Sequence, residues 1–187
     1  MLTLNFHPFP NLETPRLLLR RVVEADAPQI MVLRGDAENM KFVPRPLVTN
    51  IEQALQHYEM IDAKIVNNEG INWAIALKEN PNKMLGIIGH YKIHTEHFRS
   101  EIGYMLVPEL HGKGIVTEAI KAVLIYGFDV LNLHSVEAII DPNNIASEKA
   151  LLKNGFVKEA HILENEYYDG KFIDTVIYSL LKRNFKK

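Results

Sequence analysis

The sequence of 187 residues contains no cysteine. This absence excludes disulfides and thiolate metal sites, and it makes an intracellular, cytoplasmic protein the expected class. An excess of charge of either sign is missing too, because 21 lysines and arginines face 23 aspartates and glutamates, for a formal net charge of −2. A chain so balanced has no basic field for a nucleic-acid backbone, and we expect no nucleic-acid partner.

Long apolar runs, repeats and low-complexity segments are also absent. No stretch approaches the roughly 20 apolar residues that a membrane-spanning helix needs, so we expect no membrane partner. Residues 1–16 lack the basic start and apolar run that are typical of a signal peptide. No linker rich in proline, glycine or serine divides the chain, and its length suits one well-buried core. We therefore predict a single domain over residues 1–187.

The first half of the chain is predicted to hold strands and helices in alternation. Residues 16–22 have the pattern of a buried strand, and Asp26 is the expected cap of a helix that ends near Gly35. Apolar residues recur at helical spacing over 51–66 and predict a helix there. Thr49 and Glu52 have the spacing of a capping box at its start. The segments "INWAIAL", "MLGIIGHYKI" and "SEIGYMLV" come next with short turns between them. They predict an antiparallel meander whose first strand is half-buried.

The second half returns to helical periodicity. Residues 117–131 predict a helix, residues 135–140 a strand, and residues 144–155 a second helix that ends at Asn154–Gly155. Two final strands, separated by the turn "YYDGK", close the chain. The predicted fold class is α+β, a mixed and mostly antiparallel sheet of six to seven strands with helices on both faces.

The segment "HGKG", residues 111–114, leads from a strand that ends at Val107 into the helix near Thr117. It is not a Walker A loop, which needs glycine at Val107, nor a dinucleotide fingerprint, which needs glycine at Thr117. The first turn of a helix nevertheless has N–H groups without intrahelical partners and about half a positive charge. Glycines let an anion approach, and Lys113 adds a cation, so a phosphate site and a plain turn both remain open.

A second pattern, "DPNNIASEKALLKNGF" (141–156), directly follows a predicted strand. Asn144 suits a helix N-cap, and Ser147 falls on the first helical turn, so each has a purely structural explanation when taken singly. The combination with the turn at 111–114 is more specific than either pattern alone.

Together these stretches resemble the GNAT N-acetyltransferases, specifically the RimJ/RimL-like branch. The resemblance is carried by "LETPRLLLRRVVEADA", "EIGYMLVPELHGKGIVTEAI", "NNIASEKALLKNGF" and "YYDGKFIDTVIYSLL". It implies the acyl-CoA N-acyltransferase fold, and an enzyme that transfers the acetyl group of acetyl-CoA to an amine without a metal. It also allows a homodimer.

The resemblance further implies a set of cofactor-binding residues. In the family, a Q/R-x-x-G-x-G/A turn holds the pyrophosphate of the cofactor with backbone amides. The matching positions here are His111, Gly112, Lys113, Gly114, Ile115 and Val116, with Thr117 opening the helix. The pantetheine arm is expected along the backbone of Met105, Leu106 and Val107, with Asn144 facing the cofactor and Ser147 near its sulfur. Two positions depart from the family pattern, His111 for glutamine or arginine and Val116 for a small residue.

Acyl transfer to an amine needs a neutral amine, a donor for the developing oxyanion and a proton for the leaving thiolate. Glu101 is the expected base, acting through water; its alternative role is a salt-bridged residue at the strand end. Ser147 is the expected proton donor, ahead of Tyr168 and Tyr178. The N–H of Leu106 or Val107 is the expected oxyanion donor.

The acceptor is expected to lie against residues 39–50, the helix 51–66 and the last hairpin, where Glu164 and Glu166 could attract an amine or remain solvated. An α-amine costs about 1 kcal/mol to neutralise at pH 7, whereas a lysine-like amine costs about 4–5 kcal/mol. We therefore expect a protein or peptide N-terminal α-amine as acceptor. A small-molecule amine, such as a polyamine or an amino-sugar antibiotic, and a non-catalytic acyl-CoA-binding module remain alternatives. His90, His94 and His97 lack the spacing of a helical metal-ligand pair, and we expect no metal site.

Overall fold

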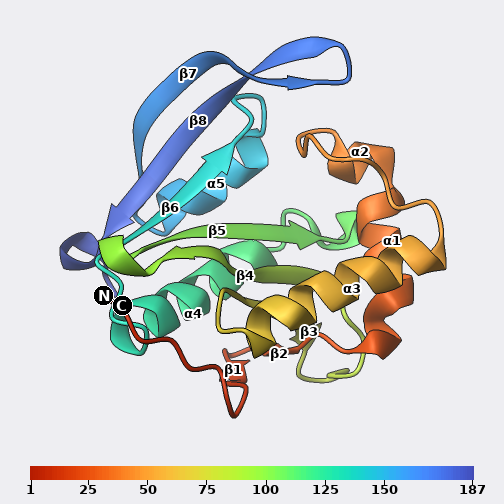
Figure 1. Cartoon of the computed structure of the whole chain (residues 1–187), viewed down its shortest axis with the longest axis horizontal. Helices are drawn as coiled ribbons and strands as arrows, with labels where there is room; N and C mark the ends of the chain where they lie inside the picture. Colours follow the sequence, from red (N-terminus) through yellow and green to blue (C-terminus); the bar gives the residue numbers. More distant parts are fainter.

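The computed structural model describes all residues from 1 to 187. A single eight-stranded sheet, in the order β1-β2-β3-β4-β5-β6-β8-β7, runs through the molecule (Figure 1). All neighbouring strands are antiparallel except β5 and β6, which run parallel. The predicted α+β class with a mixed, mostly antiparallel sheet is confirmed, and the sheet has eight strands in place of six to seven.

The elements have the following bounds. The strands are β1 (Leu12–Glu13), β2 (Leu17–Arg21), β3 (Ile71–Leu77), β4 (Gly86–His94), β5 (Arg99–Leu106), β6 (Ser135–Ile140), β7 (Val157–Tyr168) and β8 (Lys171–Leu181). The α-helices are α1 (Ala27–Gly35), α2 (Ala37–Met40), α3 (Ile51–Val66), α4 (Ile115–Asp129) and α5 (Ile145–Lys153). None of the helices has both the length and the apolar character needed to cross a membrane.

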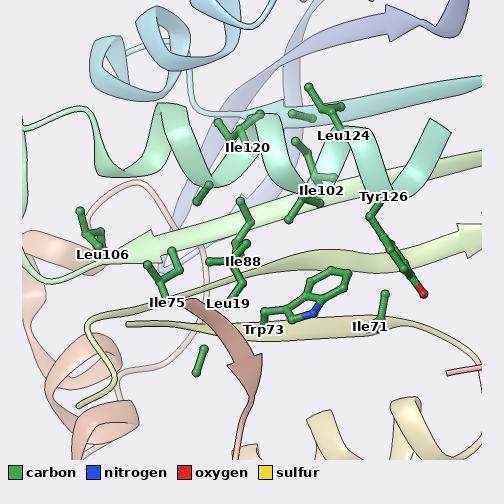
Figure 2. Close-up of a cluster of buried hydrophobic side chains, with 14 of the residues drawn as sticks. Leu19, Ile71, Trp73, Ile75, Ile88, Ile102, Leu106, Ile120, Leu124 and Tyr126 are labelled. Atoms are coloured by element: carbon green, nitrogen blue, oxygen red, sulfur yellow. The ribbon is translucent and has the colours of Figure 1, made fainter. Parts of the chain in front are cut away.

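Helices cover both faces of the central strands. Helices α1 and α3 lie over one face and α4 over the other (Figure 1). Strand β3 is therefore buried from Ile71 to Ala76, although its alternating pattern predicted burial on one face only. Figure 2 shows Trp73 and Ile102 packed between α4 and the sheet. Trp73 is 0% exposed, and its indole Nε1 donates a 2.7 Å hydrogen bond to the carbonyl of Pro10.

The helix starts differ in detail from the predicted caps. Asp26 stands at the N-cap of α1, but its carboxylate makes no capping bond and instead accepts two hydrogen bonds of 2.8 Å from Arg20. Helix α3 is capped by Asn50, whose side chain accepts from the N–H of Gln53. The Gln53 side chain accepts from the N–H of Thr49, so the predicted pairing of Thr49 with Glu52 is wrong. These differences arise because a nearby partner of higher charge, or a better-placed amide, competes for the same groups.

The sheet opens between β5 and β6. The two strands pair only at Arg99 with Ser135, Ser100 with Val136 and Glu101 with Glu137. Beyond these positions β5 stays with β4 and β6 stays with β8. The long β7–β8 hairpin then extends past α5 towards the side of the molecule that carries α2 (Figure 1). Its tip is a tight turn in which Asp169 and Gly170 both have positive φ.

Candidate active site

A cavity of about 730 Å³ lies beside the open part of β5. Its walls are the end of β5, the first turns of α4 and α5, and the segment from α2 to Val43. Most of the predicted cofactor residues meet there: Met105, Leu106, His111, Gly112, Gly114, Ile115, Val116, Thr117, Asn144 and Ser147. Three predicted site residues do not line the cavity: Glu101, Val107 and Lys113.

The glycine turn presents a run of free amides. The N–H groups from Gly112 to Thr117 donate to no other atom of the protein. Gly112 and Gly114 have φ values of +74° and +73°, a left-handed conformation that favours glycine. Gly114 is the N-cap of α4, so the helix begins at Ile115, two residues before its predicted start. Amides of this kind at a helix N-terminus form a binding site for an anion such as a phosphate.

Two residues of the N-terminal part of the chain, Thr14 and Arg16, hold this turn together with Glu118 of α4, and we call the three the Arg16 clamp. The guanidinium of Arg16 donates to the carbonyl of Lys113 at 3.1 Å and to the Glu118 carboxylate at 2.7 Å. The other oxygen of Glu118 accepts from the Arg16 N–H at 3.0 Å and from the Thr14 hydroxyl. Burial raises the pKa of Glu118, but these hydrogen bonds outweigh it and hold that pKa below its ordinary value.

Lys113 is not part of the cavity wall, contrary to the cation expected there. Its carbonyl accepts the hydrogen bond from Arg16. Sequence reasoning missed the clamp because Arg16 and Glu118 are separated by 102 positions and neither has a distinctive local pattern.

Main-chain groups of β5 face the opening. The N–H of Val107 donates to the carbonyl of Leu85 at 2.9 Å, on the side of β4. Because successive N–H groups of a strand point in opposite directions, the N–H of Leu106 points away from β4, where β6 has already separated. Of the two expected oxyanion donors, Leu106 therefore has a free N–H and Val107 does not.

His111 occupies the position that the family fills with glutamine or arginine. Its Nε2 lies 2.9 Å from the carbonyl oxygen of Leu106. A carbonyl oxygen only accepts, so the ring must donate from Nε2. His111 therefore binds the free edge of β5 and ties the glycine turn to the strand that precedes it.

Glu101 lies where β5 and β6 separate. The residue is 7% exposed, and the Tyr91 hydroxyl donates a hydrogen bond to its carboxylate. Burial chiefly raises the pKa of Glu101, with a smaller rise from Glu137, while the Tyr91 hydrogen bond opposes both. The ion pair at this end of the strand joins Arg99 to Glu137 at 3.6 Å and leaves Glu101 out. This arrangement favours a base over the salt-bridged alternative.

Tyr91 was not expected at the site. Strand β4 has a bulge between His90 and Lys92, and the extra residue turns Tyr91 towards the face that carries Glu101. Its ring lies 3.0 Å from the place that a Cβ of Gly103 would occupy, so the missing side chain of Gly103 makes room for it. A bulge has no reliable sequence signal, which is why periodicity alone did not find this pair.

The candidate proton donors separate into different places. Ser147 lines the 730 Å³ cavity, and its N–H donates to Asn144 Oδ1 at 3.1 Å, which confirms Asn144 as the cap of α5. Tyr178 is buried, donates to Glu148 at 2.6 Å and lines neither of the two cavities described here.

Tyr104, which the sequence pattern did not indicate as a site residue, also lines the large cavity, and its hydroxyl lies 3.5 Å from the carbonyl of Ser147. Burial raises the pKa of Tyr104 to about 12.

Two further cations line the same cavity. Lys149 and Lys153 lie four positions apart on α5, so they project from one face of the helix. Their i, i+4 spacing was visible in the sequence and could have identified them as a pair beside the predicted anion site.

A second cavity, of about 200 Å³, lies between the segment after α2 and the β7–β8 hairpin. Phe42, Arg45, Asp141, Tyr168 and Ile173 are among its lining residues, and it shares Lys41, Phe42 and Val43 with the large cavity. The predicted loop and hairpin therefore meet here. Helix α3 contributes no lining residue, and Glu164 and Glu166 lie outside the cavity.

The three clustered histidines do not converge. His90 is fully buried between the sheet and α4, with Nδ1 2.8 Å from the Ser100 hydroxyl and Nε2 3.0 Å from the Val123 carbonyl. Burial lowers the pKa of His90 to about 4, so the ring is neutral at pH 7. His94 and His97 lie at the other end of β4, in and after its last position.

Comparisons with known proteins agree with this geometry. The family model described as "Acetyltransferase (GNAT) domain" matches residues 16–157. YoaA of Bacillus subtilis (strain 168), an uncharacterized N-acetyltransferase, is 34% identical over 93% of this chain and 98% of its own. The spermidine N(1)-acetyltransferase of Escherichia coli (strain K12) is 28% identical over 54% of each chain.

Solved structures share the fold. A GNAT-family acetyltransferase from Bacillus anthracis has a TM-score of 0.81 and 26% identity, over 93% of this chain and 99% of that one. RimL, a ribosomal L7/L12 alpha-N-protein acetyltransferase in complex with coenzyme A, has a TM-score of 0.83 and 21% identity, over 92% and 98% of the two chains. The extent of the family match and of the YoaA alignment shows that this chain belongs to the GNAT acetyltransferase family.

Proposed function

We propose that this protein transfers the acetyl group of acetyl-CoA to the α-amine of a protein or peptide N-terminus. One observation carries the proposal: residues 112–117 have free N–H groups, and all of them except Lys113 line a cavity that also contains Ser147 and the free edge of β5. This cavity suits a long thioester that carries a diphosphate. It combines an anion site at the glycine turn, the free edge of β5 and the hydroxyl of Ser147. The coenzyme A complex of RimL, which has the same fold, supports this assignment.

The residues present fit acetyl-CoA along the length of the cavity. The amides of the glycine turn would hold its pyrophosphate, and Lys149 and Lys153 add positive charge on the facing helix. The open main chain of β5 at Tyr104 would pair with the amide groups of the pantetheine arm. Ser147 would then lie beside the thioester sulfur.

Each chemical requirement of the transfer has a candidate group. Glu101 takes a proton from the amine through water, and its raised pKa brings it nearer to the working pH. The Leu106 N–H donates to the carbonyl oxygen as negative charge develops on it. As the new C–N bond forms and the C–S bond breaks, Ser147 supplies a proton to the sulfur and regains one from water, while Glu101 releases to water the proton taken from the amine. The products are an amide and free coenzyme A.

The separation between Glu101 and the cavity requires that the proton be relayed through water molecules. Glu101 precedes Met105 by four positions on β5, about 13 Å at 3.3 Å per residue, and it does not line the cavity. A relayed base of this kind suits an α-amine, of which about half is already neutral near pH 8. A lysine-like amine would need a stronger base in direct contact.

Polyamines are the second candidate class, because one relative acts on spermidine. The small cavity gives little support to a polycation, since Lys41 and Arg45 line it against the single carboxylate of Asp141. The net positive lining would repel a ligand of several positive charges.

Thiol release tests the proposal directly. The purified protein would be incubated with acetyl-CoA and a panel of peptides, polyamines and amino sugars, and free coenzyme A would be followed. We expect release that depends on peptides with a free α-amine and that stops when the α-amine is blocked. Binding of coenzyme A without release for any amine would instead support the non-catalytic acyl-CoA-binding module.

Variants at saturating acetyl-CoA test the two catalytic roles. Glu101→Gln should reduce kcat by about 100-fold or more, the usual contribution of a positioned base. Ser147→Ala should also reduce kcat, and Tyr104→Phe distinguishes the two hydroxyls in the cavity. A kcat that survives both Ser147→Ala and Tyr104→Phe would show that water protonates the thiolate.

A further inference from the structure

We infer that the acceptor carries an anionic group, a carboxylate or a phosphate, next to its reacting amine, and that Arg34 and Arg45 bind this group. The inference rests on the proposed function and names the class of acceptor that the same site selects.

Most arginines in the folded body have a carboxylate partner. Salt bridges join Arg16 to Glu118, Arg20 to Asp26, Arg21 to Asp62 and Arg99 to Glu137. Arg34 and Arg45 take part in none of the ion pairs of the molecule. A guanidinium withdrawn from water without an anion is unfavourable, and this applies to Arg34, which is half-buried. Arg45 is exposed and has no carboxylate partner, so it is free to bind an anion.

Arg34 is the more enclosed of the two. It lies on α1, its Nε is buried without any hydrogen-bond partner, and its Nη1 has only the Met105 sulfur nearby, at 3.8 Å. Met105 lines the large cavity, so the Arg34 side chain contacts a wall residue of the proposed acetyl-CoA site, although Arg34 itself lines neither cavity. Planar N–H donors in this position suit an acceptor oxygen better than a thioether.

Arg45 approaches the same region from the loop after α2. It lines the 200 Å³ cavity, and only its Nη1 is engaged, in a 2.6 Å hydrogen bond to the carbonyl of Pro44. After burial, the charge of Arg45 is the second reason that the pKa of Arg34 is lowered, which places the two guanidinium groups in each other's field. Arg45 also opposes the rise that burial and Glu101 cause in the pKa of Tyr91.

The two arginines therefore lie beside two adjoining cavities, which share Lys41, Phe42 and Val43. Arg34 touches the residue that borders the thioester side, and the field of Arg45 reaches the hydroxyl that holds Glu101. Phe42, Tyr168 and Ile173 supply apolar walls in the cavity that Arg45 lines. The cofactor phosphates have their own donors at the glycine turn.

Peptides that differ in one side chain test the inference. Peptides of one sequence with a free α-amine would carry Glu, Gln or Lys at the second position, and kcat/KM would be measured for each. We expect the Glu peptide to exceed the Gln peptide by about tenfold, as a charge-assisted hydrogen bond allows, with the Lys peptide lowest. Arg45→Gln should narrow the Glu-to-Gln ratio towards one, and Arg45→Glu should favour the Lys peptide.

Two controls separate a binding role from a general effect. Arg183 is also exposed and without an ion pair, but it lies in the C-terminal segment, so Arg183→Gln should leave the Glu-to-Gln ratio unchanged. Coenzyme A affinity, measured by calorimetry, should be the same for Arg45→Gln and the wild type. A matched pair of small amines, glycine and glycinamide, and an aminoalkyl phosphate would show whether a free carboxylate or phosphate satisfies the pair without a peptide.

Three outcomes would overturn the inference. Equal kcat/KM for the Glu, Gln and Lys peptides in the wild type would show that no anion is recognised, while the transferase function would stand. A loss of coenzyme A affinity in Arg45→Gln would assign the arginine to the cofactor. Coenzyme A binding without acetylation of any acceptor would remove the proposed function itself.

Discussion

The Tyr91 hydroxyl donates a hydrogen bond to the Glu101 carboxylate at the place where β5 and β6 part. Burial and the neighbouring Glu137 raise the pKa of Glu101, and Tyr91 acts in the opposite direction by binding the ionised form. The pKa of Glu101 therefore results from opposing effects, and removal of the Tyr91 hydroxyl should raise it.

Tyr91→Phe should move the acid limb of the kcat/KM profile to higher pH. The base is active when ionised, so activity rises with pH through the pKa of Glu101, and loss of the hydrogen bond raises that pKa further. A pH–rate profile of the variant against the wild type measures the shift. Tyr167→Phe is the matched control, because Tyr167 lies exposed on the hairpin. An acid limb that stays in place would mean that another group controls it.

Loss of the Arg16 clamp should weaken coenzyme A binding. Arg16→Gln frees the Lys113 carbonyl and loosens Glu118, so the amides of the turn lose their fixed direction. We expect affinity to fall by about 5- to 30-fold, on the order of 1–2 kcal/mol, as measured by calorimetry. Lys78→Gln, which breaks an exposed 2.9 Å pair with Glu13, is the control and should have no effect on affinity. Equal affinities for Arg16→Gln and the wild type would show that the turn holds its shape unaided.

Gly112→Ala should weaken coenzyme A binding through the backbone alone. A Cβ at Gly112 would meet nothing within 4 Å, so the cost comes from its φ of +74°, about 1 kcal/mol for alanine. Gly170 gives a close match, because it has φ +77° and equally open surroundings but lies at the hairpin tip. Both variants should lose similar stability in urea unfolding, and only Gly112→Ala should lose coenzyme A affinity. A parallel loss in both variants would contradict an anion site at residues 112–117.

His90 should make the fold sensitive to mild acid. Burial lowers its folded pKa from 6.5 to about 4, so the unfolded chain binds a proton that the folded protein refuses between these values. The resulting stability is fully present above pH 6.5 and is lost as the pH falls towards 4, up to about 3 kcal/mol. Urea unfolding at several pH values measures it, and His90→Gln should flatten this part of the curve. His57, whose pKa burial also lowers to about 4, adds to the slope.

The sequence predicted the parts of the site that are contiguous in the chain. The strand, turn and helix from Met105 to Thr117 carry their own glycines and breaks, and the α5 cap depends on Asn144 and Ser147 only three positions apart. Local rules decide such segments, because the interacting groups are neighbours whatever the remainder of the chain does.

The residues that were missed depend on long-range pairing. Arg16 meets Glu118 only after β2 and α4 have docked, and Tyr91 meets Glu101 only through the bulge in β4. The full burial of β3 likewise requires helices on both faces, a fact that its own alternating pattern does not contain. Nothing in the sequence distinguishes Arg34 and Arg45 from other surface arginines. They are distinguished in the structure because neither forms an ion pair and because Arg34 Nε has no hydrogen-bond partner.

Trp73, enclosed by the sheet and α4 with its indole tied to the carbonyl of Pro10, is also the sole tryptophan of the chain. Its ring lies 5.3 Å from that of Tyr126 on α4 and 6.0 Å from that of Phe9 in the N-terminal segment. The protein thus contains one intrinsic fluorophore at a point where three parts of the chain meet. Its emission should shift to longer wavelength when the N-terminal segment detaches, which gives an optical readout of that event without any added label.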